Sequence, residues 1–170
     1  SGCSALNSSN FSDIGMGPKG AMLTSSMLRS ERVNAAISLF DISGNFIFGS
    51  KLQYGDCGDN IHDVDKDQTG FAAICDALSG CSELNSINFS DIGMGPKGAV
   101  MTSSMLRSHR LIAAMSRLVI GANPIGTEGA QALIAVLPQT QIEVLGIGKD
   151  LELNFVEECT SLDASNQSLL

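Results

Sequence analysis

The feature that most constrains this chain is that its first 40 residues occur twice. Residues 1–40 recur as residues 79–118, at an offset of 78, and 30 of the 40 aligned positions are identical. Repetition at a fixed offset is typical of arrays, in which each structural unit packs only against its neighbours. We therefore expect one continuous array of small units with an extended binding surface, rather than two separate domains.

A shorter apolar frame recurs inside the 78-residue block. Its clearest copy reads Met115-x-x-Leu118-x-Ile120-x-x-Asn123. The frame starts five times, at Leu6, Ile37, Leu84, Met115 and Ile142. Apolar side chains two positions apart at its centre predict a short strand with one buried face. Outward-facing positions then alternate with the buried ones along each strand.

A glycine-marked turn and a helical pattern follow the well-kept frames. After the fourth frame, apolar residues repeat at helical spacing over residues 130–137, with Thr127 as the expected N-cap and Pro138 as the stop. In the two long copies, Pro18 and Pro96 suit the first helical position. The predicted unit is therefore a strand, a tight turn, a helix and a return loop.

The stretch between the first and second long copies is the least regular. Residues 70–78 have the usual helical pattern, so we expect a degenerate strand before them, around residues 58–64. An irregular or lengthened loop is expected over residues 49–59. Such a loop offers contacts that the regular units lack, and it carries the only tyrosine of the chain, Tyr54.

At this point the chain resembles the leucine-rich repeat family, in its ribonuclease-inhibitor-like subclass. That subclass carries the frame L-x-x-L-x-L-x-x-N followed by I-G-x-x-G-A, and residues 117–138, RLVIGANPIGTEGAQALIAVLP, match it best. The resemblance covers most of residues 1–150. The chain departs from it at Ile14, Ile92 and Asp150, where the family has an asparagine that hydrogen-bonds loop backbone. Those turns must satisfy their backbone groups in another way.

The resemblance implies the fold class α/β, as a leucine-rich-repeat solenoid. In that architecture a right-handed β-α superhelix places parallel strands on the concave face and helices on the convex face. We expect about six repeats over residues 1–156, irregular around residues 46–68. The Ser-, Asp- and Asn-rich tail, residues 157–170, is expected to be disordered or the remnant of a cap.

The implied function is a non-catalytic protein–protein interaction scaffold or a peripheral subunit of a larger assembly, with no cofactor and no catalytic residue. The candidate partner-binding residues of the concave face are Asn10, Leu39, Asp41, Asn88, Arg117 and Val119. Arg117 is the strongest of these, because binding hot spots are rich in Trp, Tyr and Arg. Tyr54 is a second candidate contact, from the irregular loop.

A nucleotide-binding α/β enzyme is the first alternative. Residues 15–20 read Gly-Met-Gly-Pro-Lys-Gly, lie between a predicted strand and a helix, and recur as residues 93–98. In dinucleotide-binding folds such glycines bring backbone N–H groups to a pyrophosphate. The acidic residue expected about 20 positions further on matches Asp41 in the first copy but Val119 in the second. Tandem units with one consensus favour the array.

A calcium-modulated interaction module is the second alternative. Asp63, Asp65 and Asp67 give the D-x-D-x-D start of an EF-hand loop, and they are weak candidate metal ligands. That loop also needs a glycine at position six and a glutamate at position twelve. Gln68 and Ile74 stand there instead, so a solvated acidic loop is the simpler interpretation.

Charge, hydropathy and cysteine usage narrow the partner classes. The net charge of −8 is opposite to the basic footprint of nucleic-acid binders. No apolar run approaches the roughly 18 residues of a membrane span. The five cysteines lack the paired spacing of a disulfide framework. We therefore expect an intracellular protein in a reducing compartment, with the cytoplasm favoured over an organelle, that binds a protein partner or belongs to a multi-subunit complex.

Overall fold

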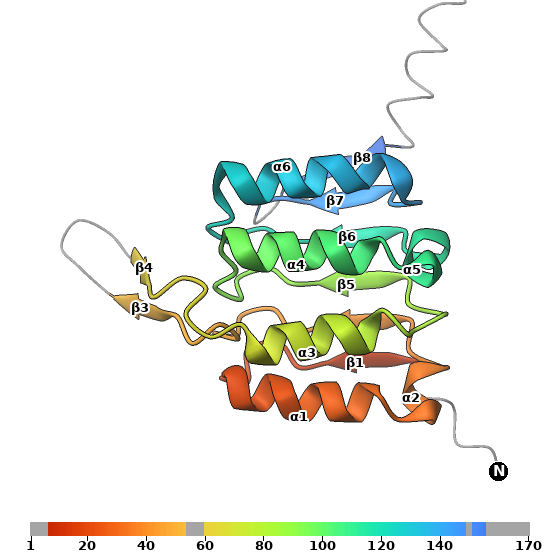
Figure 1. Ribbon diagram of the computed structural model, residues 1–170, viewed down its shortest axis with the longest axis horizontal. Helices are drawn as coiled ribbons and strands as arrows, with labels where there is room; N and C mark the ends of the chain where they lie inside the picture. The colour runs from red at the N-terminus through yellow and green to blue at the C-terminus, as the bar shows by residue number, and fades with distance from the viewer. Residues whose placement is uncertain (1–6, 54–59, 149–150, 156–170) are drawn as a thin grey trace, which may run out of the picture.

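Six strands form one sheet, and five of them run parallel in the order of the sequence. The computed structural model describes residues 7–53, 60–148 and 151–155. The strands of this sheet are, in spatial order, β1 (Ser8–Asn10), β2 (Leu39–Asp41), β5 (Ser86–Asn88), β6 (Arg117–Val119), β7 (Val144–Gly146) and β8 (Glu152–Asn154). Strands β1 to β7 of this sheet pair in parallel (Figure 1). Each of the five frames in the sequence therefore gives one strand, at the predicted position.

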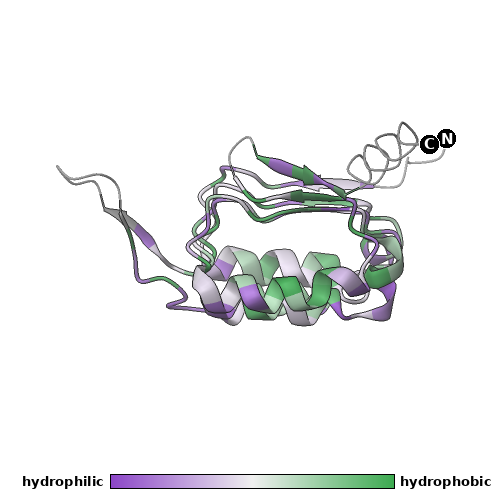
Figure 2. Cartoon of the chain, turned by 90° about the horizontal axis from the view of Figure 1, so that it is seen from above, coloured by the Kyte–Doolittle hydropathy of each residue, from purple (hydrophilic) through white to green (hydrophobic). Residues whose placement is uncertain are grey.

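The long helices cover one face of this sheet (Figure 2). The helices are α1 (Pro18–Leu28), α2 (Glu31–Asn34), α3 (Thr69–Leu78), α4 (Pro96–Leu106), α5 (His109–Ala114), α6 (Gly126–Val136) and the 3-10 helix η1 (Leu137–Gln139). Both prolines expected at first helical positions lie there. The expected cap at Thr127 is wrong, because the turn closes earlier: the Ile125 N–H donates to the Asn123 carbonyl (2.9 Å), and α6 begins at Gly126.

The core lies between the sheet and the helix layer. The central residue of each parallel strand points into it and is buried: Ser9, Phe40, Ile87, Leu118 and Leu145. Phenylalanine rings join the layers, with ring centroids 4.8 Å apart for Phe48 and Phe71 and 5.1 Å apart for Phe71 and Phe89. Such ring pairs contribute beyond their buried area. They hold the segment after β2, through Phe48, against α3 and the sheet.

The strand expected around residues 58–64 is not part of this sheet. Within the described residues, β4 (Asn60–His62) pairs antiparallel with β3 (Lys51–Gln53) in a separate hairpin, which projects beside the main body in Figure 1. The sheet passes directly from β2 to β5. The 78-residue block therefore holds two strand–helix units, the second with a long insertion before α3, and the sheet of the described residues has five parallel strands. The chain between β2 and α3 folds onto itself, so it supplies the hairpin instead of a further sheet strand.

Asparagines satisfy the backbone of two adjacent turns at once. Asn45 accepts a hydrogen bond from the Met16 N–H (2.7 Å) and donates to the carbonyls of Phe11 (2.7 Å) and Ile42 (2.9 Å). Asn123 makes the same kind of bonds to the turns after β5 and β6. The two turns that carry isoleucine in place of asparagine are therefore satisfied by the asparagine of the next turn along the sheet.

The position before that asparagine or isoleucine has a left-handed backbone in every described turn. The φ angles are 53° at Asp13, 68° at Gly44, 51° at Asp91 and 56° at Ala122. Glycine adopts this conformation without cost, and Asp tolerates it better than most residues. Asp13 and Asp91 hold this left-handed position in the turns after β1 and β5. Both lie beside the face of the sheet that the helices leave open.

Strand β8 departs from the parallel pattern. It pairs antiparallel with β7, with Leu145 opposite Leu153. Only residues 147–151 connect the two strands. A parallel connection needs a crossover of a dozen or more residues, whereas an antiparallel pair needs only a short turn. The expectation that every strand of the sheet is parallel is therefore wrong at this edge.

The described helices are all short. In the ranges given above, none of them combines the length and the apolar character that crossing a membrane requires.

Candidate functional site

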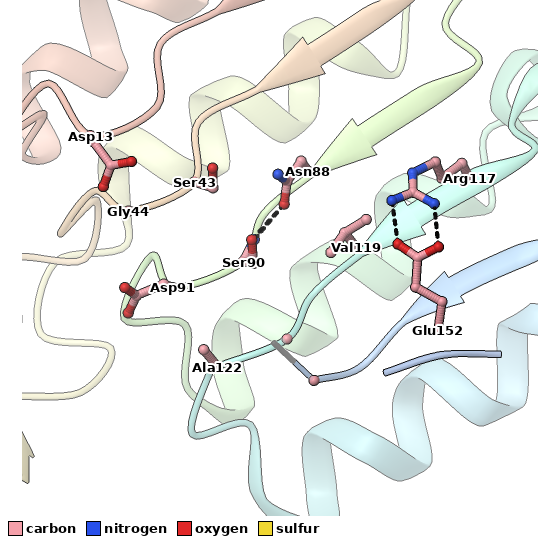
Figure 3. Close-up of a pocket in the computed structure, with 12 residues that line it drawn as sticks. Asp13, Ser43, Gly44, Asn88, Ser90, Asp91, Arg117, Val119, Ala122 and Glu152 are labelled. Atoms are coloured by element: carbon pink, nitrogen blue, oxygen red, sulfur yellow. Dashed lines mark hydrogen bonds and ion pairs between the residues drawn. The ribbon is translucent and has the colours of Figure 1, made fainter. Parts of the chain in front are cut away.

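The sheet face opposite the helices, which we call the free face, carries a cavity of about 510 Å³ (Figure 3). Its lining comes from the strands β5 and β6, the turns after β1, β2, β5 and β6, and the segment around β8. The lining residues are Asp13, Ser43, Gly44, Asn88, Ser90, Asp91, Arg117, Val119, Gly121, Ala122, Gly148 and Glu152. The cavity thus lies at the carboxyl ends of successive strands, where equivalent positions of several units meet.

A repeated polar turn forms much of this surface. Three neighbouring strands end in an Asn or Asp two residues before a Ser: Asn10 and Ser12, Asp41 and Ser43, Asn88 and Ser90. In the cavity, the Asn88 Oδ1 accepts hydrogen bonds from the Ser90 N–H (3.1 Å) and Oγ–H (2.6 Å). The Asn88 Nδ2 also donates to the Asp41 Oδ2 (3.1 Å) on the adjacent strand. Side-chain bonds within each turn and across the strands make this face ordered and polar.

The strongest sequence candidate, Arg117, is already paired. Its guanidinium donates two hydrogen bonds to the Glu152 carboxylate on β8, one of them 2.8 Å long (Figure 3). The hydrogen bond and the charge of Arg117 lower the pKa of Glu152, and the pKa of Arg117 is raised by the same contact. The Arg117 guanidinium is therefore paired with the Glu152 carboxylate. A ligand that enters the cavity meets this ion pair instead of an unpaired cation.

The charge of the cavity lining is net negative. Three carboxylates, from Asp13, Asp91 and Glu152, accompany one guanidinium, that of Arg117. Asp13 and Asp91 are exposed and occupy the same position in the two long copies. A cationic or donor-rich partner surface complements such a lining better than an acidic one does.

Sequence reasoning found part of this lining. Asn88, Arg117 and Val119 line the cavity. The other sequence candidates of this face, Asn10, Leu39 and Asp41, lie on β1 and β2 outside the lining. The residues that it missed include Asp13, Asp91, Ala122 and Glu152. Three of these hold the left-handed turn position, a signal readable from the frame, whereas Glu152 depends on the antiparallel turn into β8. Tyr54 and Asp150 lie outside the described residues.

The two glycine loops have different surroundings despite identical sequences. In the second copy, the Asp65 carboxylate accepts hydrogen bonds from the backbone N–H groups of Gly95 (2.9 Å), Lys97 (2.8 Å) and Gly98 (3.3 Å). These are the amides at the start of α4 that a phosphate would need, and a carboxylate there is favourable. In the first copy, no side chain within the described ranges caps α1.

The three aspartates of the acidic loop point to three different partners. Asp65 is buried against the start of α4. The Asp63 carboxylate accepts a hydrogen bond from the Lys66 Nζ (2.7 Å), and this contact lowers its pKa. Asp67 accepts from the Thr69 N–H (3.0 Å) at the start of α3, which lowers its pKa as well. Over the part of the chain that the structure describes, no three His, Cys, Asp or Glu side chains gather as a metal site would require.

Neither the protein-family models nor the curated proteins give a significant match.

Proposed function

We propose that the chain is a leucine-rich-repeat solenoid of the ribonuclease-inhibitor-like subclass and that it binds a protein partner, without catalysis, through the free face of its sheet. The frame and turn sequences quoted above support the family. The sequential parallel strands, the one-sided helix layer and the asparagines that join adjacent turns support the architecture. A stack of such units leaves the strand face open for a partner, which is the common use of these surfaces.

The observation that carries the proposal is the ordered polar cavity at the carboxyl ends of the strands. Its walls come from successive units, so it offers a row of equivalent side chains and not a single reacting group. The Ser90 hydroxyl donates to the Asn88 side chain of its own turn, and none of the described residues that line the cavity is a histidine, cysteine or lysine. This composition suits hydrogen-bonded recognition of a peptide or protein surface, either by an adaptor or by a peripheral subunit of a complex.

The experiment is partner capture with a surface variant and a matched control. Val119→Arg places a long cation on the cavity wall, and Ala135→Arg places the same side chain on an exposed position of α6. Both proteins should unfold at the same temperature as the parent chain. We expect native capture followed by mass spectrometry to recover the same partner with the parent and with Ala135→Arg, and to lose it with Val119→Arg. Loss with neither variant would contradict the free face as the binding surface.

A further inference from the structure

The turn before α1 leaves exposed a surface that is covered in the second copy. Ile14 is 61% exposed, whereas its equivalent Ile92 is fully buried at 0%. A Cβ added at Gly15 or Gly17 would meet nothing within 4 Å. At the equivalent Gly93 it would meet the Ser50 Oγ at 2.0 Å. The same sequence is therefore a contact surface in one copy and a solvent-facing surface in the other.

Helix α3 provides the cover along the helix layer. Its residues Ala72 and Cys75 face Met101 and Met105 of α4 across a shallow groove between the two helices. Met105 is buried there, and Met101 packs against the core. Because α4 is the copy of α1, the first copy should present the corresponding surface on α1.

The corresponding side chains of α1 are apolar and exposed. Leu23 replaces Met101 and is 76% exposed. Met22 beside it is 45% exposed, close to the 39% of its equivalent Val100. Among the described residues, α1 packs on its other side against α3, where Gly70 allows the helices to approach. Large apolar side chains that cluster on one open face mark interaction surfaces. We give the name α1 end to the open positions on this side of the first unit: Ile14, Gly15, Gly17, Met22 and Leu23.

The covering unit also supplies a carboxylate and a strand. Asp65 accepts hydrogen bonds from the first amides of α4, and β2 pairs in parallel with β5. Within the described ranges, the start of α1 has no such acceptor and β1 has no partner on its outer edge. The second copy thus receives a carboxylate, a neighbouring strand and a covering helix from the unit before it. Within the described residues, the α1 end has none of these three.

We propose that the α1 end is a docking surface for a repeat unit built like residues 38–79. The partner unit would add a strand parallel to β1, place an aspartate over the start of α1, and lay a helix with small side chains against Met22 and Leu23. It would thereby reproduce the contact between α3 and α4 that the molecule already contains. This surface is separate from the free face, so its test stands or falls independently of the proposed function.

A second copy of the described structure does not supply such a unit. Its own Asp65 is already hydrogen-bonded to the start of α4, and its α3 lies between α1 and α4. The opposite end of its sheet is closed by the antiparallel strand β8. The occupant that fits is therefore a further repeat unit with a free aspartate, and we do not expect the chain to self-associate through the α1 end.

The test adds such a unit and measures burial of position 14. In an extended protein, residues 1–78 are placed once more before Ser1, so that Leu78 is followed by Ser1 as it is naturally followed by the equivalent Ser79. Ile14→Cys is introduced into the original block of this protein and into the 170-residue chain. Alkylation rates of that thiol are then read by mass spectrometry. We expect the rate to fall at least about tenfold in the extended protein, because local opening must precede reaction.

Three further variants make the result decisive. Ile92→Cys should be unreactive in both proteins, which shows that both are folded, and Ile134→Cys, on the exposed side of α6, should react equally in both. Asp65→Ala in the added block alone should restore part of the rate at position 14. Equal rates at position 14 with and without the added block would overturn the proposal. So would self-association of the 170-residue chain, seen by sedimentation, that itself protects position 14.

Discussion

The two copies of the sequence Gly-Met-Gly-Pro-Lys-Gly show how far surroundings decide the role of a loop. Residues 15–20 and 93–98 are identical, follow equivalent strands and begin equivalent helices. In the second copy, Asp65 and Phe48 lie against the loop, and its amides are satisfied. In the first copy Met16 is buried, but Gly15 and Lys19 are exposed, and a Cβ added at Gly15 or Gly17 would meet nothing within 4 Å. The sequence motif alone is therefore compatible with an anion site, a packing contact or an open end, and the neighbouring unit selects among them.

The largest expected difference between the copies lies at the isoleucines of the turns. Ile92→Ala should lower the free energy of unfolding by about 3 kcal/mol, because it opens a cavity in a fully packed site. Ile14→Ala, at the equivalent exposed position, should change it by less than about 0.5 kcal/mol. Urea unfolding of both variants measures the two values. Similar losses would mean that the first turn is buried in solution.

Removing the Asp65 carboxylate should have the next largest effect. Asp65→Ala leaves three backbone amides at the start of α4 without their acceptor, and we expect a loss of about 2 kcal/mol. Asp63→Ala is the matched control in the same loop, since Asp63 is exposed, pairs with Lys66 and has a left-handed backbone like that of Asp65 (φ 58° and 54°). It should lose only about 1 kcal/mol, the cost of alanine in that conformation. If the two variants behave alike, the capping role assigned to Asp65 is wrong.

The equivalent glycines Gly95 and Gly17 differ in the space that is available for an added side chain. A Cβ at Gly95 would lie 2.3 Å from Val64 Cγ1 and 2.5 Å from Asp65 Oδ2, so Gly95→Ala should cost about 1–2 kcal/mol. Gly17→Ala meets nothing within 4 Å, and we expect a change below about 0.5 kcal/mol. Thermal unfolding of the pair is sufficient to compare them. A destabilising Gly17→Ala would indicate a cover over the first loop.

The smallest expected effect concerns two buried cysteines, Cys75 on α3 and Cys81 just after this helix. Cys75 and Cys81 are buried, and burial raises the pKa of both thiols, that of Cys81 to about 11. The pKa of the Cys81 thiol is higher in the folded than in the unfolded protein. The protonated thiol therefore contributes fully to the free energy of unfolding below pH 9, and this contribution is lost as the pH rises toward 11. Cys81→Ala should weaken this alkaline loss, as denaturant titrations between pH 7 and pH 10.5 would record. Rapid alkylation of either thiol in the folded protein at pH 7.5 would contradict their burial.

Much of the architecture was predictable from local patterns, because each frame contains its own buried side chains. The strand centred on Leu118 and the helix over residues 126–136 follow from periodicities of two and 3.6 residues. The hairpin at Lys51–Gln53 was not predictable, since its short strands have no repeated counterpart. Neither was the antiparallel β8, because its direction depends on the length of the connection and not on side-chain pattern.

The candidate sites were less readable than the fold for a related reason. Asn88 and Val119 could be assigned to the open face from alternation alone. The partners of Asp65 and of Arg117 could not, because they lie 30 to 35 residues away in the sequence. In the sequence, the acidic loop suggested a calcium site and the glycine loops suggested a nucleotide site. In the structure, the Asp65 carboxylate of the acidic loop accepts hydrogen bonds from the backbone amides of the second glycine loop. Only the packing of one unit on the next brings them together.

The most direct measurement is amide hydrogen exchange at the two loops within one molecule. Because residues 15–20 and 93–98 have the same sequence, their intrinsic exchange rates are matched, and any difference reports structure. The amides of Gly95, Lys97 and Gly98 should exchange at least about a hundredfold more slowly than those of Gly17, Lys19 and Gly20, since only the former donate to a buried carboxylate. Equal protection in the two loops would contradict the claim that the neighbouring unit, and not the loop sequence, determines what each copy does.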